Sequence, residues 1–351
     1  MKNKPAFVLA FLTILFFLIG CTPNNETSSP SEEGPEANAV EVVAEDLDTP
    51  WAIDFLPDGT LLFTERGGNI NLIRDGEVRT IATLDVNEVS ESGLLGLAVD
   101  PDYQENNFLY VYYTYEDGNR VSRFILQDET LSGETILLDN IPNARFHDGG
   151  RIKFGPDGKL YITTGDATEP SSAQDIDSLA GKILRMNKEG SVPEDNPFGN
   201  YVYSYGHRNP QGLAWTEDGK LFSSEHGPTR NDEINVIMPG ENYGWPQECT
   251  ETGDFQNPLR CFSEFTLAPG ALAYHDYALY VSGLRGAQLR KIVLDEENTA
   301  VFREEELFIN MGRIREAVVH DGYIYITTSN RDGRGIPRSN DDKIIRVELD
   351  K

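Results

Sequence analysis

Short apolar runs separated by tight turns dominate the chain, and apolar positions rarely recur at the spacing of three or four residues that marks a helix. Many of the turns contain Asp-Gly or Gly-Pro, which are typical of the connections between antiparallel strands. The pattern therefore predicts an all-β protein whose strands are only as long as the runs between these turns.

A loose unit recurs along the chain: a turn rich in Pro, Asp and Gly, a strand, a short turn and another strand. Clear copies start in residues 56–65, 155–164, 216–222 and 320–327, and weaker ones in residues 100–115 and 275–281. Six such copies are typical of the blades of a propeller. We therefore predict a six-bladed β-propeller, closed by pairing of residues 40–47 with the last blade. A β-sandwich is the main alternative, but it does not explain the repetition.

The N-terminal 39 residues have the composition of an export signal followed by a linker. Residues 1–20 combine a short basic start with an apolar run, too short for a membrane span of about 20 residues. They end in Leu-Ile-Gly before Cys21, the pattern of a bacterial lipoprotein signal. We predict removal of residues 1–20, lipidation of Cys21 and a flexible tether over residues 21–39. An ordinary signal peptide with an incidental cysteine is the alternative.

These features predict an exported protein, anchored at the cell surface or on the periplasmic side of a membrane. The remaining domain, residues 40–351, is larger than a single ordinary core, which favours two domains or a repeat architecture. The chain has 58 acidic and 30 basic residues, a net charge of −28. This balance argues against nucleic acid or anionic lipid as partners and leaves the anchor as the membrane contact.

Three cysteines divide between two roles. Cys21 is the predicted lipid anchor, whereas Cys249 and Cys261 lie close together in sequence within an exported, oxidising setting. A disulfide between them is therefore expected. Two buried free thiols are the alternative.

Three loops place His, Arg, Asn or Gln beside Gly or Pro, next to an apolar run. His147 is a candidate general base because histidine is the residue type whose ordinary pKa lies near neutrality. Arg208, Asn209 and Gln211 offer fixed hydrogen-bond donors. Arg313 and Arg315 alternate along a predicted strand, so both would face one side and meet an anion there. Taken singly, these are also the marks of a surface histidine, a structural turn and an exposed edge strand. Together they predict one pocket for a planar polyanionic cofactor on a β scaffold.

A further segment, residues 225–235, is rich in oxygen ligands. Gly227 and Pro228 can present main-chain carbonyls, and Glu233 can add a carboxylate. Ca²⁺ prefers such mixed oxygen ligands, although the spacing of an EF-hand is missing.

A series of motifs through residues 40–350 resembles the glucose/sorbosone dehydrogenase family, and within it the soluble aldose sugar dehydrogenases that use pyrroloquinoline quinone (PQQ). Any one motif is a weak signal, but the ordered set is specific. The matching stretches are ESGLLGLA (91–98), HDGGRI (147–152), LAGKILR (179–185), GHRNPQGL (206–213), HGP (226–228), DEIN (232–235), NYGWP (242–246), LRG (284–286) and RIRE (313–316).

The resemblance implies a six-bladed propeller with PQQ in the loops of one face. His147 matches the catalytic base, which takes the proton of the anomeric hydroxyl while hydride passes to the quinone. Arg208 would polarise the quinone oxygen, and Asn209 and Gln211 would line the cofactor site. The products would be a lactone and electrons for an acceptor that the sequence does not identify.

The resemblance also implies which arginines bind the cofactor and where Ca²⁺ is bound. Arg313 and Arg315 would pair with the PQQ carboxylates, and Arg285 stands where relatives place a basic cofactor contact. One Ca²⁺ would lie between PQQ and the carbonyls of Gly227 and Pro228. Glu233 and Tyr243 match positions that hold a second, structural Ca²⁺ in relatives.

Two departures from the family pattern concern the sugar. Glu91, which we place in the cofactor and sugar site, stands where glucose-oxidising relatives carry Gln. Ala167 replaces a second sugar-contacting Gln. A broad range of aldoses is therefore expected. The competing function classes are a non-catalytic propeller that binds extracellular glycans or proteins, and a propeller lactonase.

Overall fold

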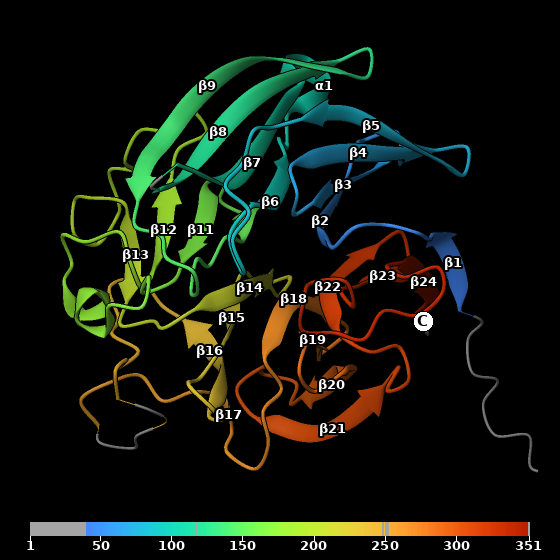
Figure 1. Cartoon of the computed structure of the whole chain (residues 1–351). Coiled ribbons are helices and arrows are strands. Elements are labelled where there is room, and N and C mark those ends of the chain that lie inside the picture. The colour runs from blue at the N-terminus through green and yellow to red at the C-terminus, as the bar shows by residue number, and fades with distance from the viewer. Residues whose placement is uncertain (1–39, 117, 248, 250–252, 350–351) are drawn as a thin grey trace, which may run out of the picture. The chain divides into compact units, whose positions relative to one another are not determined.

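The computed structural model describes residues 40–116, 118–247, 249 and 253–349, which form almost entirely β structure (Figure 1). The predicted signal peptide, Cys21 and the tether lie outside the described residues. No helix in the described part of the chain is long and apolar enough to cross a membrane. The described helices are short: α1 (Tyr103–Asn106) and the 3-10 helix η1 (Pro170–Gln174).

Within the described residues, twenty-four strands form six antiparallel sheets of four strands each, which confirms the predicted six-bladed propeller. The first three blades are β2 (Pro50–Phe55), β3 (Leu61–Glu65), β4 (Asn69–Arg74) and β5 (Glu77–Thr83); β6 (Leu94–Val99), β7 (Phe108–Tyr115), β8 (Gly118–Gln127) and β9 (Thr130–Ile141); and β10 (Ile152–Phe154), β11 (Leu160–Thr164), β12 (Lys182–Met186) and β13 (Val202–Tyr205).

The other three blades include the strand that closes the ring. They are β14 (Pro210–Trp215), β15 (Leu221–Glu225), β16 (Asp232–Ile237) and β17 (Arg260–Phe262); β18 (Pro269–His275), β19 (Ala278–Gly283), β20 (Gln288–Leu294) and β21 (Val301–Leu307); and β22 (Ile314–His320), β23 (Tyr323–Thr328), β24 (Ile344–Glu348) and β1 (Glu41–Ala44). Val42 of β1 pairs with Ile345 of β24, so the predicted closure by the N-terminal strand is confirmed.

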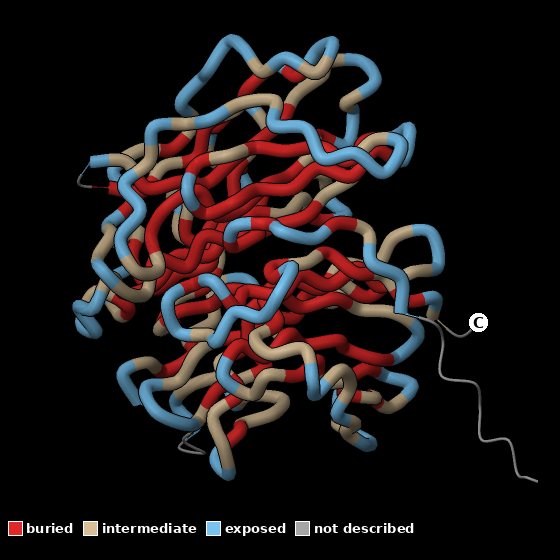
Figure 2. The backbone as a smooth tube through the Cα atoms, turned by 45° about the vertical axis from the view of Figure 1, so that its right-hand side comes forward, coloured by how far each residue is buried: buried red, intermediate tan, exposed pale blue. Residues whose placement is uncertain are grey.

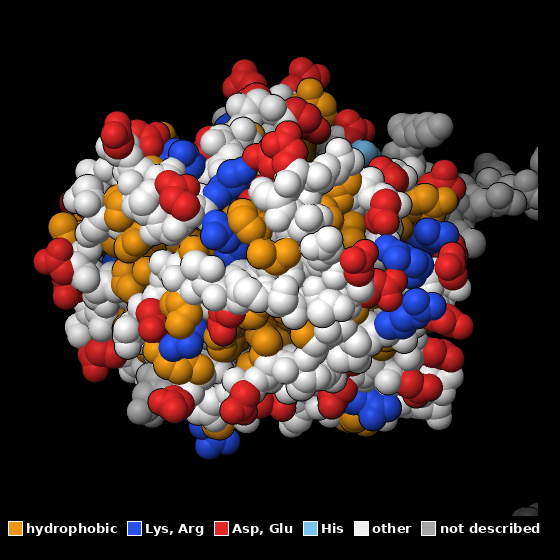
Figure 3. Space-filling view, turned by 90° about the horizontal axis from the view of Figure 1, so that it is seen from above, with side chains coloured by type: hydrophobic (Ala, Val, Ile, Leu, Met, Phe, Trp, Pro, Cys, Tyr) orange, Lys and Arg blue, Asp and Glu red, His pale blue; other side chains and the backbone are white. Residues whose placement is uncertain are grey.

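Burial explains why the second strand of each blade starts with or contains several apolar or aromatic residues. All five residues of β3, and all five of β11, are buried because both faces of these strands pack against neighbouring blades. The outer strands β5 and β21 are largely half-buried or exposed. Figure 2 shows the buried tube in the interior and the exposed tube in the loops. Figure 3 shows acidic side chains spread over one side with basic ones between them, as expected for solvated surface charge.

Each recurring Pro/Asp/Gly turn forms the hairpin between the first and second strands of a blade. Gly59 has a positive φ of 83° and Gly158 one of 70°, which suits glycine in these turns. Because strand directions alternate, these hairpins lie at one end of the blades. The connections from second to third strand, and from one blade to the next, lie at the other end.

Candidate active site

The predicted site residues gather at the end of the propeller that carries the connections between blades. This follows from topology, since residues from five blades lie in, or directly beside, connections at that end. They are Glu91 before β6, His147 before β10, Arg208 and Asn209 before β14 with Gln211 in it, Gly227 and Pro228 after β15, Arg285 after β19, and Arg313 before β22 with Arg315 in it.

His147 forms a pair with a carboxylate that sequence reasoning missed. The ring atom Nδ1 lies 2.7 Å from Oδ1 of Asp166. Oδ2 of Asp166 accepts a hydrogen bond of 2.8 Å from the indole N–H of Trp245. Since a carboxylate only accepts hydrogen bonds, the proton of His147 belongs on Nδ1, which leaves Nε2 as the basic atom. The signal for Asp166 was its place directly after Gly165, at the end of a predicted strand.

The main chain around His147 is held in an uncommon conformation. Its φ is 68°, in the left-handed region that residues other than glycine seldom adopt. Its N–H donates to Oε2 of Glu91 at 2.9 Å. A side chain at Gly165 would have its Cβ 1.8 Å from the carbonyl oxygen of His147, so the close approach of the two loops requires glycine.

Glu91 therefore supports the His147 loop from the sequence position where a sugar contact was expected. Its Oε1 lies 2.9 Å from Arg334 NH1. Burial opposes ionisation of Glu91, but the neighbouring His226, the His147 N–H and Arg334 outweigh it and lower its pKa to about 2. Glu91 is thus a carboxylate at neutral pH.

Arg208 is oriented by contacts on both sides of its guanidinium. NH1 donates to the carbonyl oxygen of His226 at 3.1 Å, and Cζ lies 5.3 Å from the ring centroid of Trp245. Its main-chain N–H donates to Glu225. Burial lowers the pKa of Arg208, because the charged form loses hydration.

Asn209 and Gln211 each connect two separate blades. Oδ1 of Asn209 accepts the N–H of Gly149 at 3.0 Å, in the loop that carries His147. Oε1 of Gln211 accepts a hydrogen bond of 2.6 Å from Arg315 NH1. Gln211 thus orients a cation that the sequence had predicted to meet the cofactor.

The two predicted carboxylate-binding arginines differ in their partners. Arg313 lies just before β22 instead of within it, and its Nε and NH2 contact Oδ2 of Asp332 at 2.8 and 2.7 Å. Arg315 is buried in β22 and forms no ion pair with any described residue. Arg285 is exposed, and its side chain forms no hydrogen bond or ion pair within the described part of the chain.

Several buried nitrogen atoms at this end of the propeller have no hydrogen-bond partner among the described residues. They are Arg151 NH2, Arg208 Nε, Asn209 Nδ2, His226 Nε2 and Arg315 Nε. A buried polar atom without a partner is costly, so an acceptor-rich ligand would stabilise this arrangement. Burial, followed by the charges of Arg315 and Arg208, lowers the pKa of His226 to about 3, so the ring is neutral at neutral pH. The donor set therefore fits a planar cofactor with several carboxylates and carbonyls.

The predicted cation ligands surround a small cavity beside this donor set. The cavity has a volume of about 10 Å³ and is lined by Arg208, Glu225, His226, Gly227, Pro228, Asn231, Glu233, Tyr243, Trp245 and Gln247. Glu225 and Glu233 face each other across β15 and β16. Burial and the charge of Glu225 raise the pKa of Glu233 to about 8, which a cation would reverse.

Carboxylates alone do not complete this cation site. The described residues contain no group of three or more His, Cys, Asp or Glu side chains placed to hold a metal ion. Asp232 accepts the N–H of Gly227 at 2.9 Å and so fixes the turn that presents the two predicted carbonyls. The hydroxyl of Tyr243 donates to the carbonyl of Val236 at 2.7 Å, and its ring stacks on His207. The donor set fits Ca²⁺ only with main-chain oxygens included.

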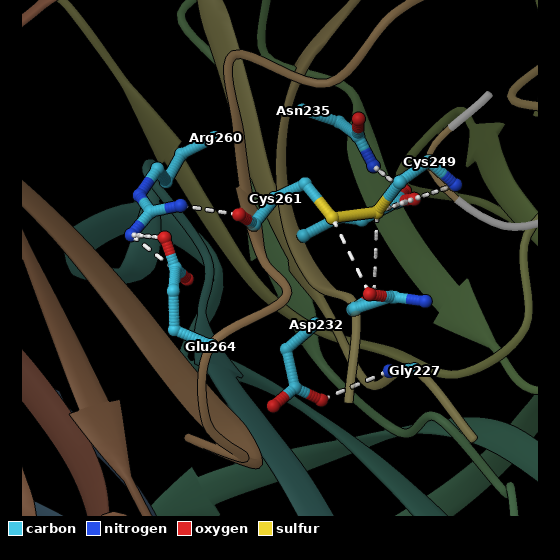
Figure 4. Close-up of a disulfide and its surroundings, with 9 residues drawn as sticks. Gly227, Asp232, Asn235, Cys249, Arg260, Cys261 and Glu264 are labelled. Carbon is cyan, nitrogen blue, oxygen red and sulfur yellow. Dashed lines mark hydrogen bonds and ion pairs between the residues drawn. A yellow bond between two sulfur atoms is a disulfide. The ribbon is translucent and has the colours of Figure 1, made fainter. Parts of the chain in front are cut away.

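The predicted disulfide is present and lies beside these ligands (Figure 4). The Cα atoms of Cys249 and Cys261 are 6.2 Å apart. The N–H of Cys249 donates to Oε1 of Glu233 at 3.3 Å. The bridge ties the connection that carries Trp245 to the outer strand β17.

Comparison with known proteins agrees with the fold. A model of one protein family, described as glucose/sorbosone dehydrogenase, matches residues 47–338. The chain belongs to the glucose/sorbosone dehydrogenase family. The sequence resemblance is thus confirmed over most of the propeller.

Individual relatives from this family match most of the chain. The chain is 30% identical to the aldose sugar dehydrogenase YliI of Escherichia coli, covering 91% of this chain and 96% of that protein. It is 34% identical to quinoprotein glucose dehydrogenase B of Acinetobacter calcoaceticus over 64% of this chain and 55% of that protein. The PQQ-bound aldose sugar dehydrogenase of Streptomyces coelicolor is 37% identical, with a TM-score of 0.84 over 90% of this chain and 99% of that structure.

Proposed function

We propose that the protein is a PQQ- and calcium-dependent aldose sugar dehydrogenase that oxidises the anomeric carbon of its substrate to a lactone. Family membership supports a sugar dehydrogenase. The observation that carries the finer proposal is the His147–Asp166 pair beside buried donors that lack partners among the described residues. A base and an acceptor-binding donor set are the two parts that hydride removal from an alcohol requires.

Each of the site residues would have a separate role in the reaction. Bound PQQ supplies the hydride acceptor. His147, with its proton held on Nδ1 by Asp166, takes the proton of the anomeric hydroxyl at Nε2. Arg208 places a buried positive charge near the acceptor and stabilises negative charge that develops there. Asn209 would help to hold the cofactor, and Arg315 would bind one of its carboxylates.

Calcium would be held by the carbonyls of Gly227 and Pro228 next to Glu225 and Glu233. Removal of the ion would leave two buried carboxylates opposite each other, with the pKa of Glu233 raised. A bound Ca²⁺ supplies Lewis acidity and a rigid contact for the cofactor.

The substrate is expected to be an aldose of broad identity. Glu91 is already engaged by His147 and Arg334, so it offers fewer free atoms to a sugar than an unpaired Gln would. The electron acceptor is a separate, unidentified partner.

Reconstitution tests the proposed function directly. Apoprotein incubated with PQQ and Ca²⁺ is expected to reduce a dye in the presence of an aldose, and chelation before reconstitution is expected to lower the rate. Initial rates with each component omitted provide the measurement. Full sugar-dependent dye reduction without PQQ would contradict the proposal, and no activity in any combination would favour a non-catalytic propeller.

We propose also that the protein is an exported lipoprotein, anchored through Cys21. Cys21→Ala is expected to block processing or to release the protein from membranes, since the anchor is the sole predicted lipid contact. Fractionation and mass spectrometry of the N-terminus check this expectation. Wild-type protein found free in the medium, without lipid on Cys21, would refute it.

A further inference from the structure

The first strands of the six blades line the axis and begin at the end that carries the candidate site. Their opening residues therefore lie at a similar depth around the axis, beneath the loops described above. These residues are Trp51 in β2, Leu95 in β6, Arg151 directly before β10, Gln211 in β14, Ala271 in β18 and Arg315 in β22. Two arginines, one glutamine and one tryptophan thus form the base of the site.

Gln211 joins the two arginines of this base. Its main-chain carbonyl accepts a hydrogen bond of 3.0 Å from Arg151 Nε, and its side-chain Oε1 accepts one of 2.6 Å from Arg315 NH1. Both guanidinium groups also contact the ring of Trp51. Cζ of Arg151 lies 4.4 Å from the ring centroid and Cζ of Arg315 lies 5.6 Å from it.

The counter-ions of this region are distributed unevenly. Glu316 follows Arg315 in sequence, yet its Oε2 pairs with Arg151 NH1 at 2.6 Å. Its carboxylate also accepts the N–H groups of Ile53 at 3.3 Å and Ala317 at 2.9 Å, which fixes it in place. Asp332 is taken by Arg313. These two carboxylates form ion pairs with Arg151 and Arg313, and the charge of Asp332 also acts to raise the pKa of Arg315. Arg315 itself forms no ion pair with a described residue.

The distribution of counter-ions matters because these side chains are buried. Arg315 is only 5% exposed, and Glu316 only 1%. A buried charge without a counter-ion is unfavourable, and burial lowers the pKa of Arg315 to about 9. An anionic group placed near Arg315 would remove this cost. If Glu316 paired with Arg315 instead, Arg315 would already have a counter-ion and would gain less from an anionic ligand.

We propose that Arg151 is a positioning residue that holds Glu316 away from Arg315 and so keeps the charge of Arg315 available for a carboxylate of the cofactor. The proposal rests on the proposed function, because it assumes that the cofactor is PQQ. Arg151 acts through its contacts with Glu316 and Gln211.

If the Arg151–Glu316 pair acts through the charge near Arg315, one substitution should change PQQ affinity in the opposite direction from that expected of a purely structural pair. Glu316→Gln removes a negative charge beneath the cofactor but keeps the size of the side chain. We expect it to lower the melting temperature of the apoprotein, since Arg151 loses its counter-ion. We also expect it to tighten PQQ binding by at least about threefold, because a like charge has been removed. A merely structural role would weaken both.

The partner substitution and the double variant complete the cycle. Arg151→Met leaves the negative charge of Glu316 without its ion-pair partner near Arg315 and is expected to weaken PQQ binding by at least about tenfold. The double variant R151M/E316Q lacks both charges, and its PQQ affinity is expected to return to within about threefold of wild type. Affinity is measured by titrating PQQ into each apoprotein with Ca²⁺ present and following tryptophan fluorescence. No sugar is needed.

A matched control uses the partly buried pair Arg290–Glu304, which spans the outer strands β20 and β21 at 2.7 Å. R290M/E304Q is expected to lower the melting temperature without changing PQQ affinity. The inference about Arg151 would be overturned if E316Q bound PQQ more weakly than wild type, or if the double variant bound PQQ no more tightly than R151M. In either case PQQ binding by the wild-type protein would still support the proposed function. A wild-type protein that binds no PQQ would contradict both the role of Arg151 and the proposed function.

Discussion

Replacing His147 with alanine is expected to lower turnover at least about 10²-fold while PQQ binding is retained. The substitution removes the atom proposed to accept the proton of the sugar, whereas the arginines and Asn209 stay in place. The measurement is kcat at saturating PQQ and sugar, together with a PQQ titration of the same apoprotein. Near wild-type turnover would show that another group is the base.

The neighbouring carboxylate offers a related substitution with a distinct signature. Asp166→Asn is expected to lower kcat and to shift its dependence on pH, because an amide does not hold the His147 proton on Nδ1 as firmly. The matched control is His320, which lies 3.5 Å from Asp321 at the opposite end of the propeller. His320→Ala is expected to leave both kcat and PQQ affinity unchanged. An unchanged pH profile in Asp166→Asn would contradict the positioning role.

The propeller could be predicted because its determinants are local and repeated. Each blade carries its own Pro/Asp/Gly hairpin and short apolar runs, so six weak signals reinforce one another. The closing strand could be predicted as well, since residues 40–47 had no other partner in the repeat. The loop positions of His147 and Arg208 followed from their polar residues beside Gly and Pro.

The partners of these residues could not be predicted in the same way. Asp166 reaches His147, Asp332 reaches Arg313, and Glu316 reaches Arg151 rather than its sequence neighbour Arg315. Such choices depend on how separate loops and blades pack, which a single sequence does not encode in any local pattern. Arg285, which its motif position predicted as a cofactor contact, lies exposed, and its role stays a prediction.

The arrangement of counter-ions changes the expectation for the two arginines near β22. Sequence reasoning treated Arg313 and Arg315 as equal contacts for the cofactor carboxylates. In the structure Asp332 already neutralises Arg313, whereas Arg315 is buried without an ion pair among the described residues. An anion therefore gains more from Arg315 than from Arg313.

Arg315→Ala is accordingly expected to raise the dissociation constant of PQQ by roughly 10- to 150-fold, the loss of one charge-assisted contact worth about 1.5–3 kcal/mol. Part of the activity should return at saturating PQQ, because His147 and Asp166 remain in place. The comparison is R313M/D332N, which removes an internally neutral pair and is expected to change the constant by less than about threefold. PQQ titration of each apoprotein, followed by initial rates at saturation, separates binding from turnover. Normal PQQ binding by Arg315→Ala would mean that the cofactor carboxylates lie elsewhere, since the vacated charge would then have had no anion to hold.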